Sequence, residues 1–175
     1  MFATRSSDWM LSLKKLVTGS GCSVAIVPLS YYLSLNGKHA EAWNFLLPTI
    51  IFSLIPLVDA LLGRDPANPE ERLQVPAMEN ALDYRILTLA CVPVLLSLLG
   101  WGGWVLARNT MWSWLDQLGW TLSIGEVMGA IGITVAHELV HKDPAIEQNA
   151  GGLLLAAVCY AGFKVEHVRG HHVHV

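Results

Sequence analysis

The chain has 175 residues, of which 53% are hydrophobic and 14% are charged, whereas soluble domains carry about 25% charged residues. This composition excludes a disordered chain and argues against an ordinary soluble domain, because a core of this size could not bury the long apolar runs. The net charge of −3 provides no basic surface, so no nucleic-acid partner is expected. A lipid bilayer is the expected environment of the apolar runs.

Four apolar segments are long enough to cross a bilayer, whose hydrocarbon core of about 30 Å needs roughly 20 helical residues. They are Leu16–Leu35, Trp43–Leu62, Ile86–Leu106 and Leu118–Ala136. The gaps between them, Asn36–Ala42, Gly63–Arg85 and Ala107–Gln117, are rich in Gly, Asn, Pro and charge, as loops are. The sequence therefore predicts an all-α fold, a polytopic helical membrane bundle with four spanning helices.

Lysine and arginine near the span ends predict the orientation, because cytoplasmic loops are enriched in them. Arg5, Lys14 and Lys15 precede the first span and Arg64, Arg72 and Arg85 lie in the second gap, whereas the other gaps hold only Lys38 and Arg108. Six tryptophans then fall near the opposite interface, which suits the amphipathic indole: Trp43, Trp101, Trp104, Trp112, Trp114 and Trp120. The N-terminus, the second gap and the residues after Ala136 are therefore predicted to be cytoplasmic.

The apolar segment Ala150–Phe163 has only 14 residues and as a helix would reach about 21 Å, which is short of a crossing. Segments of this length are more often re-entrant or buried. We expect it not to span the membrane.

The three cysteines, Cys22, Cys91 and Cys159, lie in apolar stretches without the spacing of a metal site or a disulfide framework. They are expected to be buried small hydrophobic residues.

Five of the seven histidines form two clusters near the end of the sequence. The first holds His137 and His141, and the second holds His167, His171 and His172. Residues four apart project from one face of a helix, and imidazole is the commonest metal ligand, suited to iron, zinc and copper. The five histidines are therefore the candidate metal ligands, and no catalytic residue is expected beyond them.

The first cluster also matches the HExxH motif of zinc peptidases, in which the glutamate between the histidines acts as base. One tetrahedral zinc with an open position would leave the second cluster without a function. Two metal ions fit the number of imidazoles better, and a membrane zinc peptidase is the alternative from a different class.

Three glutamates are candidates for supporting roles. Glu138 and Glu166 adjoin candidate ligands and could accept hydrogen bonds from imidazole N–H groups. Glu126 lies eleven residues before His137, about three turns of a regular α-helix, so the two would share a face. Glu126 is a candidate channel-lining residue, or else an intramembrane acid with a structural partner.

The paired motifs resemble a known family. The string His137-Glu138-Leu139-Val140-His141-Lys142, followed by Glu166-His167-Val168-Arg169-Gly170-His171-His172, resembles the first two histidine boxes of the bacterial integral-membrane alkane 1-monooxygenases. The stretch Pro56-Leu57-Val58-Asp59-Ala60-Leu61-Leu62-Gly63, with Asn68-Pro69 after it, is similar to the second span and following loop of that family.

The resemblance implies a non-haem di-iron enzyme that holds two iron ions and uses O2. Electrons delivered by rubredoxin would support hydroxylation of the terminal methyl group of a linear alkane to a 1-alkanol. It also implies the bacterial inner membrane as the location. The distribution of Lys and Arg predicts that the N-terminus and the metal site lie on the cytoplasmic side. Similar boxes occur in xylene-type monooxygenases and in membrane fatty-acid desaturases and hydroxylases, which are the alternatives of related chemistry.

Members of that family carry further histidines in an HYG-type motif and a third box, which this sequence does not contain. We therefore expect residues 1–175 to be a single membrane domain, the N-terminal fragment of a longer enzyme, inactive on its own. We also expect His141 and His167 to lie on one side of the membrane within the diameter of a metal site. His174 is expected at the surface, and His39 has no assigned role.

Overall fold

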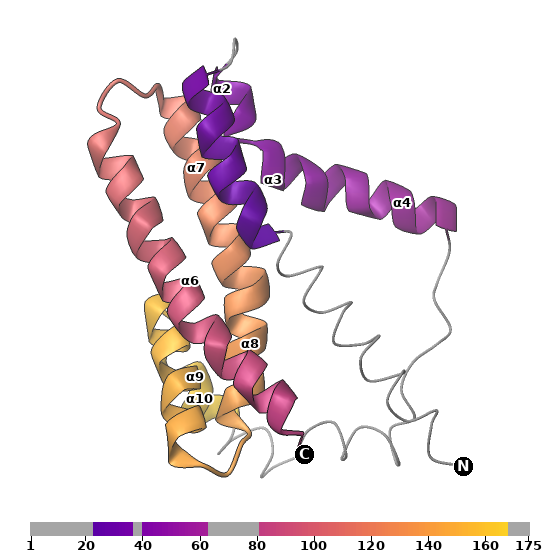
Figure 1. Cartoon of the computed structure of the whole chain (residues 1–175), viewed down its shortest axis with the longest axis vertical. Coiled ribbons are helices and arrows are strands. Elements are labelled where there is room, and N and C mark those ends of the chain that lie inside the picture. The colour runs from indigo at the N-terminus through magenta and orange to yellow at the C-terminus, as the bar shows by residue number, and fades with distance from the viewer. Residues whose placement is uncertain (1–22, 37–39, 63–80, 168–175) are drawn as a thin grey trace. The chain divides into compact units, whose positions relative to one another are not determined.

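A computed structural model describes residues 23–36, 40–62 and 81–167, and every regular element among them is helical (Figure 1). Residues 23–36 form the first described helix. The others are α2 (Ala40–Trp43), α3 (Leu46–Thr49), α4 (Ile55–Leu62), α6 (Leu82–Arg108), α7 (Trp114–Glu126), α8 (Ile133–Val140), α9 (Ala145–Ala157) and α10 (Phe163–Val165), with π-helical segments η1 (Ile50–Leu54) and η2 (Val127–Gly132). The predicted all-α class is confirmed for these residues.

Among the described residues, two helices are long and apolar enough to cross a membrane. α6 has 27 residues, and α7, η2 and α8 together form a second 27-residue helix, Trp114–Val140. The mean hydropathy over an 18-residue window is 1.9 in the first and 1.4 in the second. These helices contain the predicted spans Ile86–Leu106 and Leu118–Ala136. Both helices are consistent with a helical membrane protein.

The loop between these helices is shorter than the predicted gap Ala107–Gln117, because α7 already begins at Trp114. The Asp116 carboxylate accepts hydrogen bonds from the N–H (3.0 Å) and the hydroxyl (2.7 Å) of Ser113, and the Ser113 Oγ accepts from the Asp116 N–H at 3.2 Å. This arrangement is a capping box with aspartate in the third position, and it satisfies donors that the first turn would leave free.

The two remaining predicted spans are helical where they are described. The first, Leu16–Leu35, is helical from residue 23, and its earlier residues lie outside the described part of the chain. In the second, Trp43–Leu62, residues 46–62 form a continuous helix through α3, η1 and α4, about 25 Å long at 1.5 Å per residue. The helix α2 occupies part of the predicted loop Asn36–Ala42.

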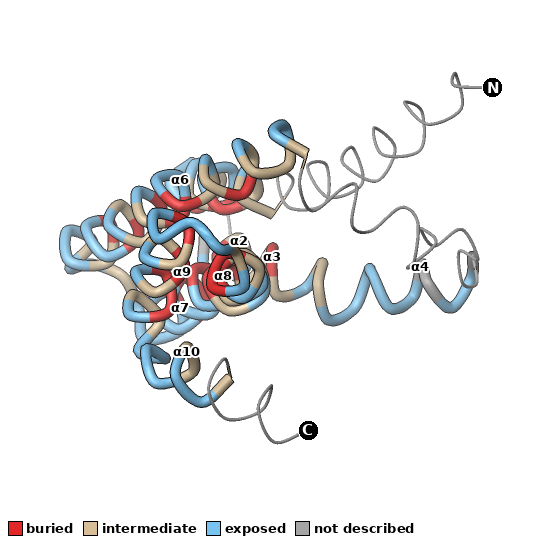
Figure 2. Tube along the Cα trace, turned by 90° about the horizontal axis from the view of Figure 1, so that it is seen from below, coloured by how far each residue is buried: buried red, intermediate tan, exposed pale blue. Residues whose placement is uncertain are grey.

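Apolar side chains are exposed along η1 and α4. Figure 2 shows no buried residue in the part of η1 and α4 whose burial is described, and the exposed large hydrophobic side chains there are Phe52, Leu54, Ile55, Leu57 and Leu61. Such a surface would be unfavourable in water but suits contact with lipid.

The chain divides into two compact units, of which one contains residues 23–36, α2 to α4 and α7 as far as Ser123. Its buried polar centre is Asn44, which donates to Asp116 at 3.1 Å and whose carbonyl accepts from Ser123 at 2.9 Å. A Cβ on Gly119 would lie 2.7 Å from the Phe45 ring, so α7 packs closely against the backbone at Asn44 and Phe45.

The other unit contains most of α6 and the chain from Ile124 onward. In it, α9 folds back along α8 after a short turn (Figure 1). A Cβ on Gly151 of α9 would lie 2.8 Å from the Ala136 carbonyl oxygen and 3.0 Å from Leu139 Cβ. Only glycine allows this approach, which resembles the small-residue contacts of membrane helix pairs.

α9 has 13 residues, about 20 Å of helix, and ends at Ala157. The predicted apolar segment Ala150–Phe163 therefore does not form one long helix. α9 ends in a Schellman motif, in which the N–H groups of Tyr160 and Cys159 donate to the carbonyls of Leu155 (2.8 Å) and Ala156 (3.0 Å). Cys159 takes the left-handed position with a φ of 60° and is exposed, so its predicted burial is wrong.

Replacing Gly151 with alanine is expected to lower the free energy of unfolding by about 1–3 kcal/mol, because the new methyl group meets backbone that cannot move away. Thermal unfolding of the purified protein in detergent measures the effect. Gly103→Ala in α6 is the matched control, since a Cβ there meets nothing within 4 Å. Equal stability of the two variants would contradict the close packing of α8 on α9.

Replacing Cys159 with glycine is expected to stabilise the protein by about 0.5–1 kcal/mol, because glycine adopts a positive φ without the steric cost of a Cβ. The same unfolding measurement tests this. Cys159→Ala removes the thiol but keeps the Cβ, and should show no gain.

Candidate metal centre

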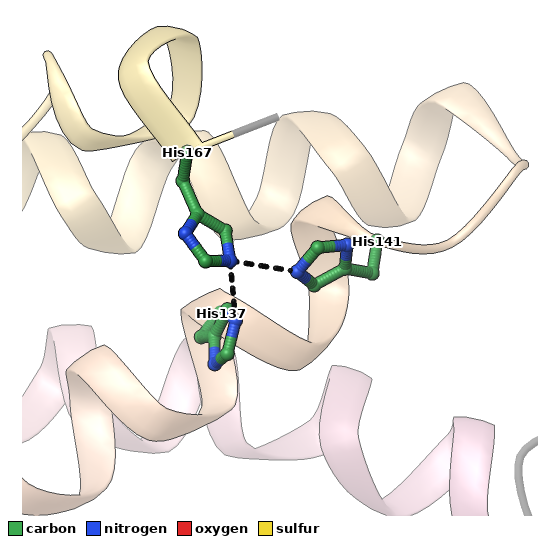
Figure 3. Close-up of side chains that lie close together, drawn as sticks. All are labelled: His137, His141 and His167. Atoms are coloured by element: carbon green, nitrogen blue, oxygen red, sulfur yellow. Dashed lines mark hydrogen bonds between the residues drawn. The ribbon is translucent and has the colours of Figure 1, made fainter. Parts of the chain in front are cut away.

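Three of the predicted ligands come together at the end of α8. His137 lies in the last turn of α8, and His141 is its C-cap, with φ −83° and ψ −11°. His167 follows α10, where the chain returns after α9. Figure 3 shows the three imidazoles pointing toward one another, and we call them the histidine triad.

The distances within the triad are short. The Nε2 atom of His167 lies 2.8 Å from Nε2 of His137 and 3.0 Å from Nε2 of His141. One ligand nitrogen from each residue lies within 4.8 Å of the others, His137 and His141 are exposed, and His167 is half-buried. The expectation that His141 and His167 lie within the diameter of a metal site is therefore confirmed.

This geometry suits a cation better than hydrogen bonds alone. A neutral imidazole nitrogen is either a donor or an acceptor, so Nε2 of His167 can make a good hydrogen bond to only one of its two neighbours. Imidazole nitrogens lie about 2.0–2.1 Å from a bound zinc ion, which sets neighbouring ligand nitrogens roughly 3 Å apart. The two pairs that include His167 have this separation, whereas the three ligand nitrogens together lie within 4.8 Å of one another. A metal ion would use all three lone pairs once the rings of His137 and His141 move closer together.

Aromatic packing holds the ring of His167. Phe163 stacks on it with ring centroids 4.7 Å apart and 14° between the planes, and meets the ring of His137 edge-on at 5.9 Å. Tyr160 packs against Phe163 in turn at 5.1 Å. Phe163 is not among the predicted site residues, although its place four residues before His167, one helical turn away, could have indicated it.

The predicted supporting carboxylates have different surroundings. Glu138 forms an ion pair of 2.6 Å with Lys142, one turn along. Glu166 is exposed directly before His167. Their role as acceptors for imidazole N–H groups stays a prediction.

Glu126 is half-buried at the end of α7, and its Oε2 has no hydrogen-bond partner among the described residues. The π-helical segment η2 separates it from α8. A π-helix bonds i to i+5 and so turns less per residue than an α-helix, which means that the assumption of a regular α-helix from Glu126 to His137 is wrong. Their predicted common face does not follow from the spacing, and the channel-lining role stays a prediction.

The remaining two predicted ligands, His171 and His172, lie outside the described residues, as do His39 and His174.

Comparison with known proteins identifies relatives that match the whole length of this chain. It is 61% identical over 181 residues to alkane 1-monooxygenase 2 of Pseudomonas aeruginosa, a match that covers 100% of this chain and 47% of that protein. Alkane 1-monooxygenase 1 of the same organism is 52% identical over 176 residues, with 100% of this chain and 46% of that protein covered. Alkane 1-monooxygenase 2 of Alcanivorax borkumensis is 42% identical over 177 residues, with the same two shares covered.

The chain belongs to the alkane 1-monooxygenase family. The match lies in the N-terminal part of these relatives, and the chain spans about half the length of the curated relatives it matches. No protein-family model matches it. The resemblance drawn from the two histidine motifs is confirmed.

Adding Co²⁺ is expected to stabilise the protein, because an ion bound only by the folded state raises the free energy of unfolding, by about 2.7 kcal/mol at a hundred times the Kd. His137→Ala and His167→Ala should each lose most of this gain. Unfolding temperature against Co²⁺ concentration measures it, with His39→Ala as control. Equal gains in all variants would exclude the histidine triad as the binding site.

Proposed function

We propose that the whole protein hydroxylates the terminal methyl group of linear alkanes to give 1-alkanols, using O2 and electrons from rubredoxin. The observation that carries the proposal is the convergence of His137, His141 and His167 in a chain of this family. One oxygen atom of O2 enters the C–H bond and the other leaves as water, so the reaction consumes electrons and protons that a donor must supply.

The cofactor that fits the proposal is a pair of non-haem iron ions. The three Nε2 atoms of the histidine triad would hold one side of the centre, with His171 and His172 as further ligands. Other residues of the whole protein would supply the remaining ligands. Iron with imidazole ligands supplies the activation of O2 when bound.

The residues of this chain would position the ligands. Phe163 stacks on His167 and fixes the plane of its ring, which leaves Nε2 directed at His137 and His141. Orientation of imidazole rings by their neighbours is a general requirement of metal sites.

The membrane setting suits the substrate. We propose four spanning helices in the bacterial inner membrane, with the N-terminus and the histidine triad on the cytoplasmic side. An alkane offers no polar group and partitions into lipid, so apolar packing alone must direct its terminal carbon to the centre. Selection among chain lengths would then rest on about 1–3 kcal/mol per methylene.

In the full-length protein, His137→Ala and His167→Ala are each expected to abolish conversion of octane to 1-octanol, because each removes a ligand of the centre. The assay is product formation with O2, rubredoxin and its reductase, together with metal analysis of the purified protein. The wild type should hold two iron ions per chain, and each variant fewer. His39→Ala is the matched control and should keep activity.

The same assay separates the alternatives. Oxidation of xylene or of fatty acyl chains in preference to octane would assign the protein to the related monooxygenases or desaturases. A single zinc ion, with proteolysis that Glu138→Gln abolishes, would replace the hydroxylase with a membrane peptidase.

A further inference from the structure

His167 lies on a short described helical stretch, formed by α10 and the π-helical residues 166 and 167. Val165 and Glu166 close its first turn by donating to the carbonyl of Gly162 at 3.0 and 3.1 Å. These bonds are local, so they do not fix the position of the stretch relative to α8. Contacts with α8 and α9 supply that constraint.

Two hydrogen bonds connect this segment with the end of α8 through α9. The ammonium group of Lys164 donates to the main-chain carbonyl of Gln148 at 3.1 Å. The side-chain amide of Gln148 donates to the carbonyl of Lys142 at 2.9 Å. Lys142 directly follows His141, and Lys164 lies three residues before His167, so the two bonds join the segments on which the triad is built.

The packing around Lys164 supports this connection. A Cβ on Gly152 of α9 would lie 3.6 Å from Cδ and 3.8 Å from Nζ of Lys164, so the lysine side chain lies along the surface of α9 at this glycine. Both Lys164 and Gln148 are half-buried, and a bond from a charged donor is stronger than one between neutral groups. The adjacent residue, Phe163, contacts His167 and His137 instead.

We propose that Lys164 and Gln148 are positioning residues that hold His167 at the metal-binding distance from His137 and His141. The proposal rests on the proposed function and extends it to groups that do not touch the metal. The Lys164 bond holds the segment on α9, and the Gln148 bond holds α9 on the residue after His141. The two bonds act in series, so loss of either bond is expected to loosen the position of His167.

The test measures Co²⁺ binding to the full-length, metal-free protein through the visible absorption of the bound ion. Lys164→Met, which keeps the length of the side chain but not the donor, is expected to weaken Co²⁺ affinity about tenfold, the size of effect that outer residues have on metal sites. Lys164→Arg restores a donor and should recover the affinity and the spectrum. A merely structural role would not predict this recovery.

Gln148→Met should weaken Co²⁺ binding to a similar extent. Because the bonds act in series, the Co²⁺ affinity of the double variant should be no lower than that of the single variant that binds Co²⁺ less tightly. It also provides a second route to the answer if Lys164→Met does not fold. Arg108→Met is the control for loss of a positive charge, since its guanidinium lies over the Trp104 ring at 4.9 Å.

Wild-type affinity and spectrum in Lys164→Met and Gln148→Met would overturn the proposal. Failure of the proposed function looks different: the wild type would bind Co²⁺ with the expected dependence on Lys164, yet the iron-loaded protein would not convert octane.

Discussion

The close approach of α8 and α9 at Gly151 is the constraint on which the histidine triad depends. The close approach sets the position of α9 against α8, and the turn at Cys159 then sends the chain back toward α8. His167 arrives on this return, 2.8 Å from a histidine 30 residues earlier. A bulkier residue at position 151 would separate the helices and move one ligand away from the other two.

Several polar groups near the ends of the described helices form hydrogen bonds that hold the neighbouring turns. Asp116 caps the start of α7 and binds Asn44, and Gln148 bonds the turn after α8. In an apolar environment each unsatisfied group is costly, so such bonds hold loops that would otherwise be free. The same principle makes the connection from Lys164 to Gln148 effective in placing a metal ligand.

Several predictions from local pattern were accurate, and the errors have physical causes. Hydropathy located α6 and the helix Trp114–Val140. It placed the start of the second helix too late, because a capping box can begin a helix on polar residues such as Ser113 and Asp116. The π-helix η2 was not predictable from periodicity, and it removed the argument that Glu126 and His137 share a face. The exposure of Cys159 follows from the end of α9, which apolar composition alone did not indicate.

By itself, the sequence determined the helical class, the apolar character and the identity of the candidate ligands, because composition and the spacing of residues four apart are properties of local chain geometry. It also carried the two histidine motifs that assign the family. Only the tertiary structure decided that His167 reaches His137 and His141, and that Phe163, Lys164 and Gln148 hold it there. Such contacts depend on how one helix packs on another, and Lys164 and Gln148 have no distinguishing pattern along the chain.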